Sequence, residues 1–336
     1  MPSYQPPFAI TPTILRLVAE SAEAIGRLSA QKDMESGLRL RRINRIRTIQ
    51  GSLAIEGNTL SEAQITAILD GKRVMAPPRE IQEVHNAMAA YDALADWQPQ
   101  REQDLLAAHK LLMNGLLVDA GSYRPGGVGV MLGETVIHMA PPAGRVRSLM
   151  GKLLEWLRHT EQHPLIASCV FHYEFEFIHP FADGNGRMGR LWQTLILSRW
   201  NPLMATIPVE SLVHAHQADY YQALRDSTAA TDSAPFIEFM LRMILACVQA
   251  NATPQVAPQV SPQVEALLKV LVKAMTRQEL QTALGLTDPK SFRQRYLAPA
   301  LLDGLIEMTL PDKPNSRLQK YQLTDKARRM WKSGHD

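Results

Sequence analysis

Apolar side chains recur three and four positions apart over most of residues 13–250. The spacing is regular at Ile14, Leu17 and Val18, and it returns between Leu38 and Ile49. A helix turns once every 3.6 residues, so such positions gather on one face that a core can bury. The sequence therefore predicts a mainly α-helical body.

One interval departs from the helical pattern. Residues 121–142 are rich in glycine and carry short runs of β-branched residues, among them Val128, Val130, Val136 and Ile137. β-branched side chains favour strands, and glycine favours the turns between them. This interval is predicted to form a β-hairpin that stands out from the helices.

A proline-rich repeat sets off the C-terminal part of the chain. Residues 253–264 read TPQVAPQVSPQV, and proline cannot continue the helix that is predicted to end near Cys247. Residues 251–264 are therefore interpreted as a linker.

The part after the linker, residues 265–336, has a different order of elements. Its pattern predicts helices from about Glu265, after Thr276 and from Pro289, followed by strands at 305–310 and 320–324. Three helices followed by a hairpin are the order of a winged helix-turn-helix. The region before the linker divides into an N-terminal helical region, residues 1–110, and a core of residues 111–250.

Size and charge fit this organisation. The chain has 336 residues, 46% of them hydrophobic, so it can bury one large and one small core. The formal net charge is +3, but residues 260–336 carry 13 Lys and Arg against 8 Asp and Glu, which leaves the remainder slightly negative. An acidic partner is thus expected at the C-terminal part.

The cysteines and the N-terminus indicate the compartment. Cys169 and Cys247 lie in apolar helical patterns and are interpreted as buried thiols, as in a reducing environment. The N-terminus reads MPSYQPPF, without the regions of a signal peptide, and no stretch approaches the roughly 18 apolar residues of a membrane span. A soluble cytoplasmic protein with no membrane partner is expected.

The strongest chemical signal is the segment from His179 to Arg190, which reads HPFADGNGRMGR. An apolar, aromatic helix precedes it, and helical periodicity resumes near its end. Gly184, Asn185 and Gly186 let a ligand approach the backbone closely, and the free N–H groups of the following helix favour an anion. This loop is predicted to bind phosphate.

The charged residues of the loop complete the hypothesis. Arg187 and Arg190 lie three apart, face roughly the same way on a helix and suit a polyphosphate. Asp183 is the only carboxylate of the loop, and a hard oxygen ligand beside such arginines fits Mg²⁺. His179 titrates near physiological pH and can take the proton of an attacking hydroxyl.

Two other interpretations fit part of this region. A glycine-rich turn with structural arginines would satisfy part of the pattern. A metal site could be assembled from His172, Glu174, Glu176 and His179. A helix sends residues i and i+2 to different faces, so these four side chains converge poorly.

The segment resembles the motif of the Fic (filamentation induced by cAMP) family, HPFx(D/E)GNGRxxR, at every fixed position. The resemblance implies a Fic helical core with a β-hairpin flap, Mg²⁺ and ATP, and usually transfer of AMP to Ser, Thr or Tyr of a target protein. It implies that His179 is the base, that Asp183 is the metal ligand and that Asn185, Arg187 and Arg190 hold phosphates.

A second segment, from Ser52 to Asn58, reads SLAIEGN at the end of an arginine-rich helix near residues 40–58. Alone it indicates only a helix stop with a surface glutamate. It also resembles the inhibitory motif (S/T)xxxE(G/N) of Fic proteins whose inhibitory helix is N-terminal. The resemblance implies that Glu56 pairs with Arg190 and withholds it from the γ-phosphate of ATP.

The resemblance extends to the hairpin and to a tyrosine pair. Residues 121–142 resemble the Fic flap, which docks the target's backbone, so Val136, Ile137 and His138 are expected beside the site; packing within the hairpin explains them equally well. Tyr220 and Tyr221 fall where the adenine is expected. Adjacent helical residues face apart, so one of the two belongs to the core.

The C-terminal part leaves its partner open. Basic side chains on the helix predicted from Pro289 and between the two strands would suit DNA: Lys290, Arg293, Arg295, Lys313 and Arg317. Dimerisation or presentation of a target would suit the same fold. The leading hypothesis is a protein adenylyltransferase, acting on a target or on itself, that Glu56 restrains and that forms a homodimer. The alternatives are a hydrolase that removes AMP with the help of Glu56, and a DNA-binding regulator with a nucleotide-sensing Fic domain.

Overall fold

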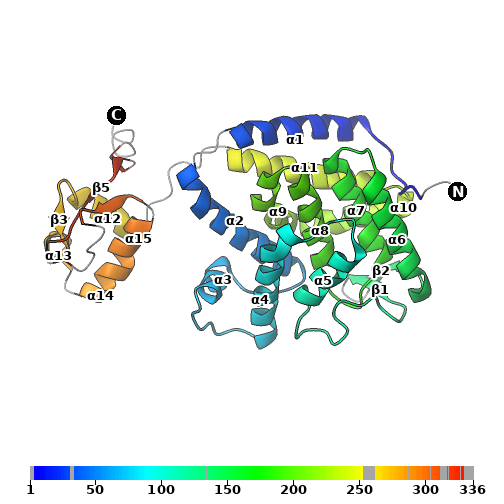
Figure 1. Cartoon of the computed structure of the whole chain (residues 1–336), viewed down its shortest axis with the longest axis horizontal. Helices are drawn as coiled ribbons and strands as arrows, with labels where there is room; N and C mark the ends of the chain where they lie inside the picture. The colour runs from blue at the N-terminus through cyan, green and yellow to red at the C-terminus, as the bar shows by residue number, and fades with distance from the viewer. Residues whose placement is uncertain are drawn as a thin grey trace. The chain divides into compact units, whose positions relative to one another are not determined.

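The chain is described by a computed structural model (Figure 1). The structure describes residues 4–30, 34–132, 135–252, 262–286, 288–302, 304–310, 316, 318–325 and 327–328, and it leaves out the side chains of 34–39, 129–132, 135–138, 252, 262, 290 and 302. Two compact units are present, Met1–Thr253 and Pro254–Asp336, and each is described by itself.

Where its residues are described, the first unit is helical apart from one hairpin and the connecting loops. Its elements are α1 (Pro12–Ala30), α2 (Met34–Ile55), α3 (Glu62–Leu69), α4 (Pro78–Asp92), the short helix η1 (Ala93–Asp96), α5 (Glu102–Leu112), β1 (Gly129–Leu132), β2 (Thr135–Met139), α6 (Ala143–His159), α7 (Pro164–Ile178), α8 (Asn185–Trp200), η2 (Pro202–Thr206), α9 (Val209–Ala215), α10 (Gln217–Ala230) and α11 (Ala234–Ala252).

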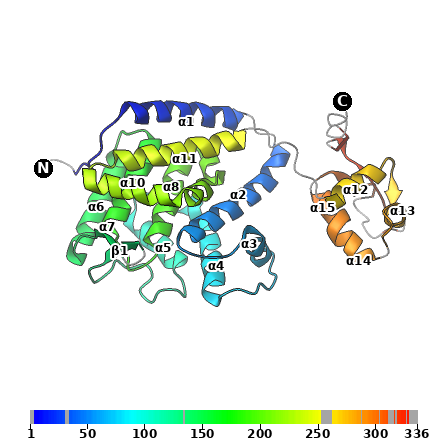
Figure 2. The ribbon, with the colours of Figure 1, turned by 180° about the vertical axis from the view of Figure 1, so that it is seen from behind.

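Helices α7 and α8 form the centre of this unit. Both are buried around almost their whole circumference, as expected of helices that other helices surround, and they pack extensively against each other. Helix α1 lies along α11 on one side of this pair, as both views show (Figures 1 and 2). The loop between α7 and α8, residues 179–184, is therefore held between two buried helices.

Helix α2 packs tightly into the same core. Its residues Ile46, Ile49 and Leu53 are buried, and it lies against α9. A Cβ atom at Gly51 would come within 2.6 Å of the Ser211 nitrogen, so this close approach of the two helices requires glycine. The end of α2 is thus fixed in position.

The predicted hairpin forms, but its strands occupy only part of residues 121–142. Strands β1 and β2 are antiparallel, with Val130 opposite His138 and Met131 opposite Val136. Ile137 lies between these pairs and has no residue opposite it on β1, which makes a β-bulge. The preceding residues, 121–128, form a loop that belongs to the base of the hairpin.

The second unit has its own apolar core and a small antiparallel sheet with the strand order β3-β5-β4. Its elements are α12 (Pro262–Val270), β3 (Met275–Thr276), α13 (Arg277–Ala283), α14 (Pro289–Phe292), the π-helical segment η3 (Arg293–Leu297), α15 (Ala298–Leu302), β4 (Ile306–Met308) and β5 (Lys320–Leu323). Helices followed by a hairpin give the predicted winged-helix order.

Three boundaries differ from the sequence prediction. Helix α11 continues past Cys247 to Ala252, and α12 begins at Pro262 because proline fits the first turn of a helix. Strand β3 was not predicted, since Thr276 also caps α13 and two residues carry no periodic signal. The linker prediction falls largely on residues 253–261, outside the described residues.

The helix predicted from Pro289 also departs from a regular pattern. It was expected as one helix, whereas the structure has a π-helical turn between α14 and α15. Pro299 lies just after this turn and has no N–H for a regular helical hydrogen bond, which accounts for the irregular turn. Arg293 and Arg295 on it are exposed. Lys313, Arg317 and the Lys290 side chain lie outside the described residues.

Candidate active site

The loop between α7 and α8 begins with an unusual backbone turn. His179 ends α7 in the left-handed conformation, with φ 49° and ψ 61°. A residue other than glycine held there costs about 1–3 kcal/mol, which the surrounding contacts must offset. The His179 N–H donates to the Phe175 carbonyl at 2.9 Å, and its carbonyl accepts a hydrogen bond of 2.7 Å from Arg124 Nε. The His179 side chain is 19% exposed at the start of the loop.

Arg124 connects this turn to the hairpin. Only 3% of it is exposed, and its guanidinium also donates to the carbonyls of Gly126 at 2.7 Å and Pro141 at 2.5 Å, one on each side of the strands. It thereby ties the hairpin base to the backbone of His179. The sequence analysis did not assign it a role, because a buried arginine that bonds backbone carbonyls leaves no pattern in the sequence.

Two further side chains shape the loop. Asn185 accepts from the Phe181 N–H and donates to the Phe181 carbonyl, both at 2.9 Å, so its amide clasps the turn. His109 accepts from the Gly121 N–H through Nδ1 and donates from Nε2 to the Asp183 carbonyl at 3.0 Å, with its ring stacked on Phe181. Burial lowers the pKa of His109 to about 4, so it is neutral. Phosphate contacts from Asn185 would then use its backbone.

The glycines of the loop have separate requirements. Gly184 begins α8 with φ 82°, and a Cβ atom there would lie 2.7 Å from the Met113 sulfur. Gly186 lies in the first turn of α8, and a Cβ there would overlap the carboxylate of Glu56 and lie 3.0 Å from Arg190 Nη1. The Glu56 carboxylate thus rests on the first turn of α8, where helix N–H groups favour an anion.

Arg190 contacts the Ser52–Asn58 segment directly. Its guanidinium is 2% exposed and donates to the Glu56 carboxylate at 2.7 Å, to Ser52 Oγ at 3.2 Å and to the Ser52 carbonyl at 3.0 Å. Asn58 lies apart from Arg190 and donates to Glu83 on α4 at 2.9 Å. Ser52 and Glu56 therefore hold Arg190, and Asn58 anchors the segment to α4.

Arg187 belongs to a closed ring of alternating charges with Asp183, Arg79 and Glu83. Asp183 lies 3.3 Å from both arginines, and Glu83 Oε1 lies 3.5 Å from both. The Asp183 side chain remains 42% exposed. Sequence analysis missed Arg79 and Glu83, whose spacing of four residues is the ordinary pattern of a surface ion pair on a helix.

The tyrosine pair divides between core and surface. Tyr220 is 2% exposed, bonds to His172 through its hydroxyl and packs against Phe236, which excludes it as a surface for the adenine in this structure. Adjacent residues on a helix face apart, which agrees with burial of only one of the two rings. Tyr221 is only partly buried and is the one that can offer a ring face.

Val136, Ile137 and His138 lie on β2, with side chains outside the described residues. Both strands keep an outer edge that no further strand of the described chain pairs.

Within the described residues no three His, Cys, Asp or Glu side chains form a metal cluster. This excludes the alternative four-residue metal site, since the Glu174 side chain accepts a hydrogen bond from the distant Tyr4.

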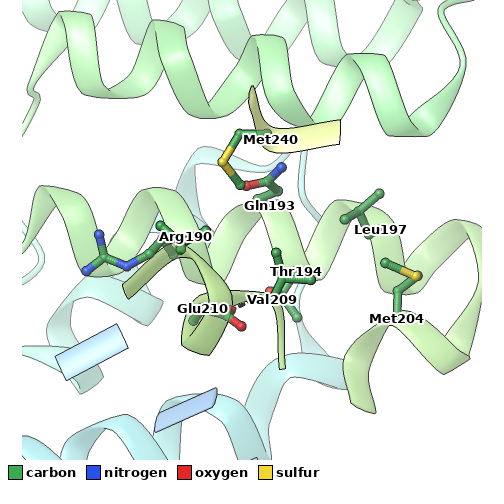
Figure 3. Close-up of a pocket in the computed structure, with 9 residues that line it drawn as sticks. Arg190, Gln193, Thr194, Leu197, Met204, Val209, Glu210 and Met240 are labelled. Carbon is green, nitrogen blue, oxygen red and sulfur yellow. Dashed lines mark hydrogen bonds between the residues drawn. The ribbon is translucent and has the colours of Figure 1, made fainter. Parts of the chain in front are cut away.

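A small cavity lies behind Arg190, inside the packing of α8 against α9 (Figure 3). Its lining is mostly apolar: Arg190, Gln193, Thr194, Leu197, Met204, Val209, Glu210, Val213 and Met240. Glu210 accepts hydrogen bonds of 2.9 Å from Tyr91 and from Thr194, and burial raises the pKa of its carboxyl. This cavity is part of the core behind the loop.

The buried His172 predicts a pH dependence of stability. Burial lowers its pKa to about 3, whereas an unfolded histidine titrates near 6.5. The unfolded chain therefore binds the extra proton first, so this stability is complete above pH 6.5 and is lost as the pH falls. Between pH 7.5 and 5 the loss should be about 2 kcal/mol. Urea unfolding should show this extra loss in the wild-type chain relative to His172→Gln, and equal losses would contradict it.

Comparisons with known proteins agree with this fold and loop. Residues 97–197 match the model of the Fic/DOC family, and residues 262–324 match the model of the filamentation induced by cAMP protein Fic-like, C-terminal domain. A Fic family protein of known crystal structure, from Desulfovibrio desulfuricans G20, is 54% identical with a TM-score of 0.75, over 96% of this chain and 99% of that one. A helical core with this loop defines a Fic/DOC-type domain. The chain belongs to the Fic family.

More distant relatives carry names that describe an activity. Protein adenylyltransferase Fic of Culex quinquefasciatus is 30% identical over 227 residues, which are 63% of this chain and 43% of that protein. Protein adenylyltransferase fic-1 of Caenorhabditis briggsae is 31% identical over 212 residues, 59% of this chain and 39% of that protein. The chain spans less than half the length of these relatives. Fic-1 of C. elegans, 23% identical with a TM-score of 0.61 over 71% of each chain, shares the fold.

Two remaining expectations concern the whole chain. Cys169 and Cys247 are both buried and form no disulfide. None of the helices in the described parts of the chain combines the length and the apolar character that a membrane crossing needs.

Proposed function

We propose that the chain is a protein adenylyltransferase that moves AMP from ATP to a Ser, Thr or Tyr hydroxyl, and that Glu56 restrains it. The observation that carries the proposal is the anion site at the start of α8, where the Glu56 carboxylate rests on Gly186 and bonds to Arg190. A site that holds a carboxylate this way suits a phosphate group. The relatives named protein adenylyltransferase support the choice of AMP transfer.

His179 acts as the base in this proposal. The target hydroxyl attacks the α-phosphorus of ATP, a new bond forms from the hydroxyl oxygen to phosphorus, and the bond to the β-phosphate breaks. The hydroxyl proton goes to the imidazole, and pyrophosphate leaves. Arg124 keeps the His179 backbone in its left-handed turn during this step, because it bonds the His179 carbonyl at 2.7 Å.

Arg187, Arg190 and the first N–H groups of α8 hold the phosphates and stabilise the charge that develops on them. Asp183 fits Mg²⁺, because its exposed carboxylate supplies hard oxygen atoms at the anion site, and the ion when bound would neutralise phosphate charge. Before the nucleotide binds, Arg187 and Arg79 neutralise Asp183.

The restraint follows from how firmly Glu56 is placed. It is the first residue after α2, whose buried side chains and close contact at Gly51 fix the helix, and Gln217 donates to the Ile55 carbonyl at 2.8 Å. Its carboxylate therefore competes with the nucleotide's outer phosphate for Arg190 without any large movement of the chain. The side chain itself is 31% exposed, so it can rotate away when α2 stays in place.

The hairpin provides a means to align the target. Its two strands have unpaired outer edges, and an extended peptide can add to such an edge through main-chain hydrogen bonds. Arg124 holds the hairpin base against the loop, so a peptide on β2 would run beside His179. This mode of binding asks for an accessible hydroxyl more than for a long sequence motif.

The proposed activity is tested with ATP labelled at the α- or the γ-phosphate. The Glu56→Gly chain, with Mg²⁺ and a bacterial protein extract, should attach the α-label to protein and leave the γ-label in pyrophosphate. Attachment of the γ-label would indicate phosphoryl transfer, and no label on any protein would contradict the proposal. Release of AMP from pre-labelled protein by the unaltered chain, lost in Glu56→Gly, would identify the hydrolase instead.

A further inference from the structure

A second glutamate lies beside the loop, one helical turn before His179. Glu176 is on α7, its side chain is 12% exposed, and among the described residues no group donates a hydrogen bond to its buried Oε1. A buried carboxyl group without a full set of partners is costly, so its position calls for a reason. Burial raises the pKa of Glu176 to about 8, which favours the neutral acid.

The neighbours of Glu176 are two histidines. Its Oε2 lies 4.0 Å from His179 Nδ1, and its Oε1 lies 3.8 Å from His172 Nε2. His172 presents Nδ1 to the amide oxygen of Gln193 at 2.7 Å and Nε2 to the Tyr220 hydroxyl at 3.1 Å. An amide oxygen can only accept, so the proton of neutral His172 is on Nδ1 and its Nε2 accepts from Tyr220.

This arrangement leaves Glu176 without a partner on the side of His172. His172 Nε2 has no proton to give, and its one lone pair already accepts from Tyr220, so it neither donates to Glu176 Oε1 nor accepts from it. The other oxygen, Oε2, faces His179 Nδ1, and a carboxyl oxygen can accept a hydrogen bond from that nitrogen. The charges that face this carboxyl group from other helices are Arg190 on α8 and Glu56 after α2, and their effects on it oppose each other.

Gly189 makes room for the same cluster. A Cβ atom at this position would lie 2.8 Å from the His172 ring and 3.0 Å from Glu176 Oε1. Any other residue would push these side chains apart or turn Glu176 away. The packing of α8 on α7 thus leaves a space of the size that the Glu176 carboxyl group occupies.

The His179 ring turns one of its nitrogens toward Glu176. Its Nδ1 is buried and faces Glu176, whereas the side chain as a whole is 19% exposed. We propose that Glu176 is the positioning residue of His179: it accepts a hydrogen bond from Nδ1–H, so that Nε2 is left without a proton and takes the one from the target hydroxyl. This inference rests on the proposed function.

The physical effect is the choice of tautomer. A neutral imidazole carries one proton, and an acceptor beside one nitrogen holds it there and leaves the other nitrogen basic. Closing the gap from 4.0 Å to hydrogen-bond length requires the two side chains to approach each other by about 1 Å. Without the acceptor, the proton divides between both nitrogens, and the ring loses its fixed orientation.

Activity variants in the Glu56→Gly background test the catalytic consequence. Glu176→Met has a similar length and no acceptor, so kcat should fall about 10- to 100-fold with the KM for ATP unchanged. Glu176→Gln keeps a carbonyl oxygen that can accept from His179 and should recover most of kcat. Equal rates for Met and Gln, or a loss confined to KM, would overturn the proposal.

A spectroscopic test does not depend on AMP transfer. ¹⁵N-histidine NMR of the unaltered full chain, with His179 assigned by its loss in His179→Gln, should place the proton on Nδ1 and leave Nε2 bare. In Glu176→Met the two nitrogens should share it, and in Glu176→Gln they should not. A proton on Nε2 in the unaltered chain would overturn the proposal even if no variant folds. The expected tautomer without any AMP transfer would instead refute the proposed function alone.

Discussion

The Glu56→Gly chain is expected to transfer AMP about 10- to 100-fold faster than the unaltered chain. The reason is the contact of the Glu56 carboxylate with Arg190 at 2.7 Å, on a guanidinium that is 2% exposed. A hydrogen bond to a charged group contributes about 1.5–3 kcal/mol, and each 1.4 kcal/mol corresponds to a factor of ten. Once the carboxylate is removed, Arg190 and the first turn of α8 are open to the outer phosphate. The measurement is the initial rate of α-label incorporation at saturating ATP.

Two controls separate release of Arg190 from loosening of α2. Glu56→Gln keeps the length of the side chain and removes its charge, so it should give an intermediate rate. Glu161→Gly makes the same replacement in the exposed loop between α6 and α7 and should leave the rate unchanged. Glu56 is not the restraint if the Glu56→Gly chain transfers AMP no faster than the unaltered chain while its ATP affinity and its stability against unfolding are the same.

The sequence specified the local chemistry of the loop because its residues are contiguous. From His179 to Arg190, the order of a helix end, a glycine turn and a helix start determines which groups are near one another, whatever the rest of the fold. The helical class and the hairpin followed from periodicity in the same way. The roles assigned to the loop residues stay predictions, and the structure adds that the amide of Asn185 shapes the loop.

The residues that sequence reasoning missed act over long distances. Arg124 reaches the His179 carbonyl across 55 positions, and Arg79 reaches Asp183 across 104. Glu83 and Glu176 have the helical spacings of ordinary surface pairs, and only the packing of α4 and α7 against α8 turns them toward the loop. Pairings of this kind depend on tertiary packing, which a single sequence does not encode in any local pattern.

The tyrosine pair shows the same limit at shorter range. The helical period states that Tyr220 and Tyr221 face apart, but not which of them faces the core. The answer depends on α11, whose Phe236 and Phe239 enclose the Tyr220 ring. A heptad-like pattern in α10 would have revealed it, whereas the mixed polar and apolar order of this helix does not.

His179→Ala is expected to lower AMP transfer by about 10²- to 10⁴-fold, the range that a positioned general base contributes. The comparison is made in the Glu56→Gly background, where transfer is measurable, and ATP binding should be unchanged because Arg187, Arg190 and α8 are intact. The matched control is His159→Ala, since this histidine is exposed on the last turn of α6.

A comparison of His179→Ala with His179→Asn distinguishes a base from a residue that shapes the loop. His179 occupies a left-handed turn that alanine also strains, so a loss of rate alone would fit a displaced loop. His179→Asn tolerates that conformation better than alanine does and removes the base, so it should restore thermal stability without restoring transfer. Recovery of the rate in His179→Asn would assign His179 to the turn and leave the proton to another group.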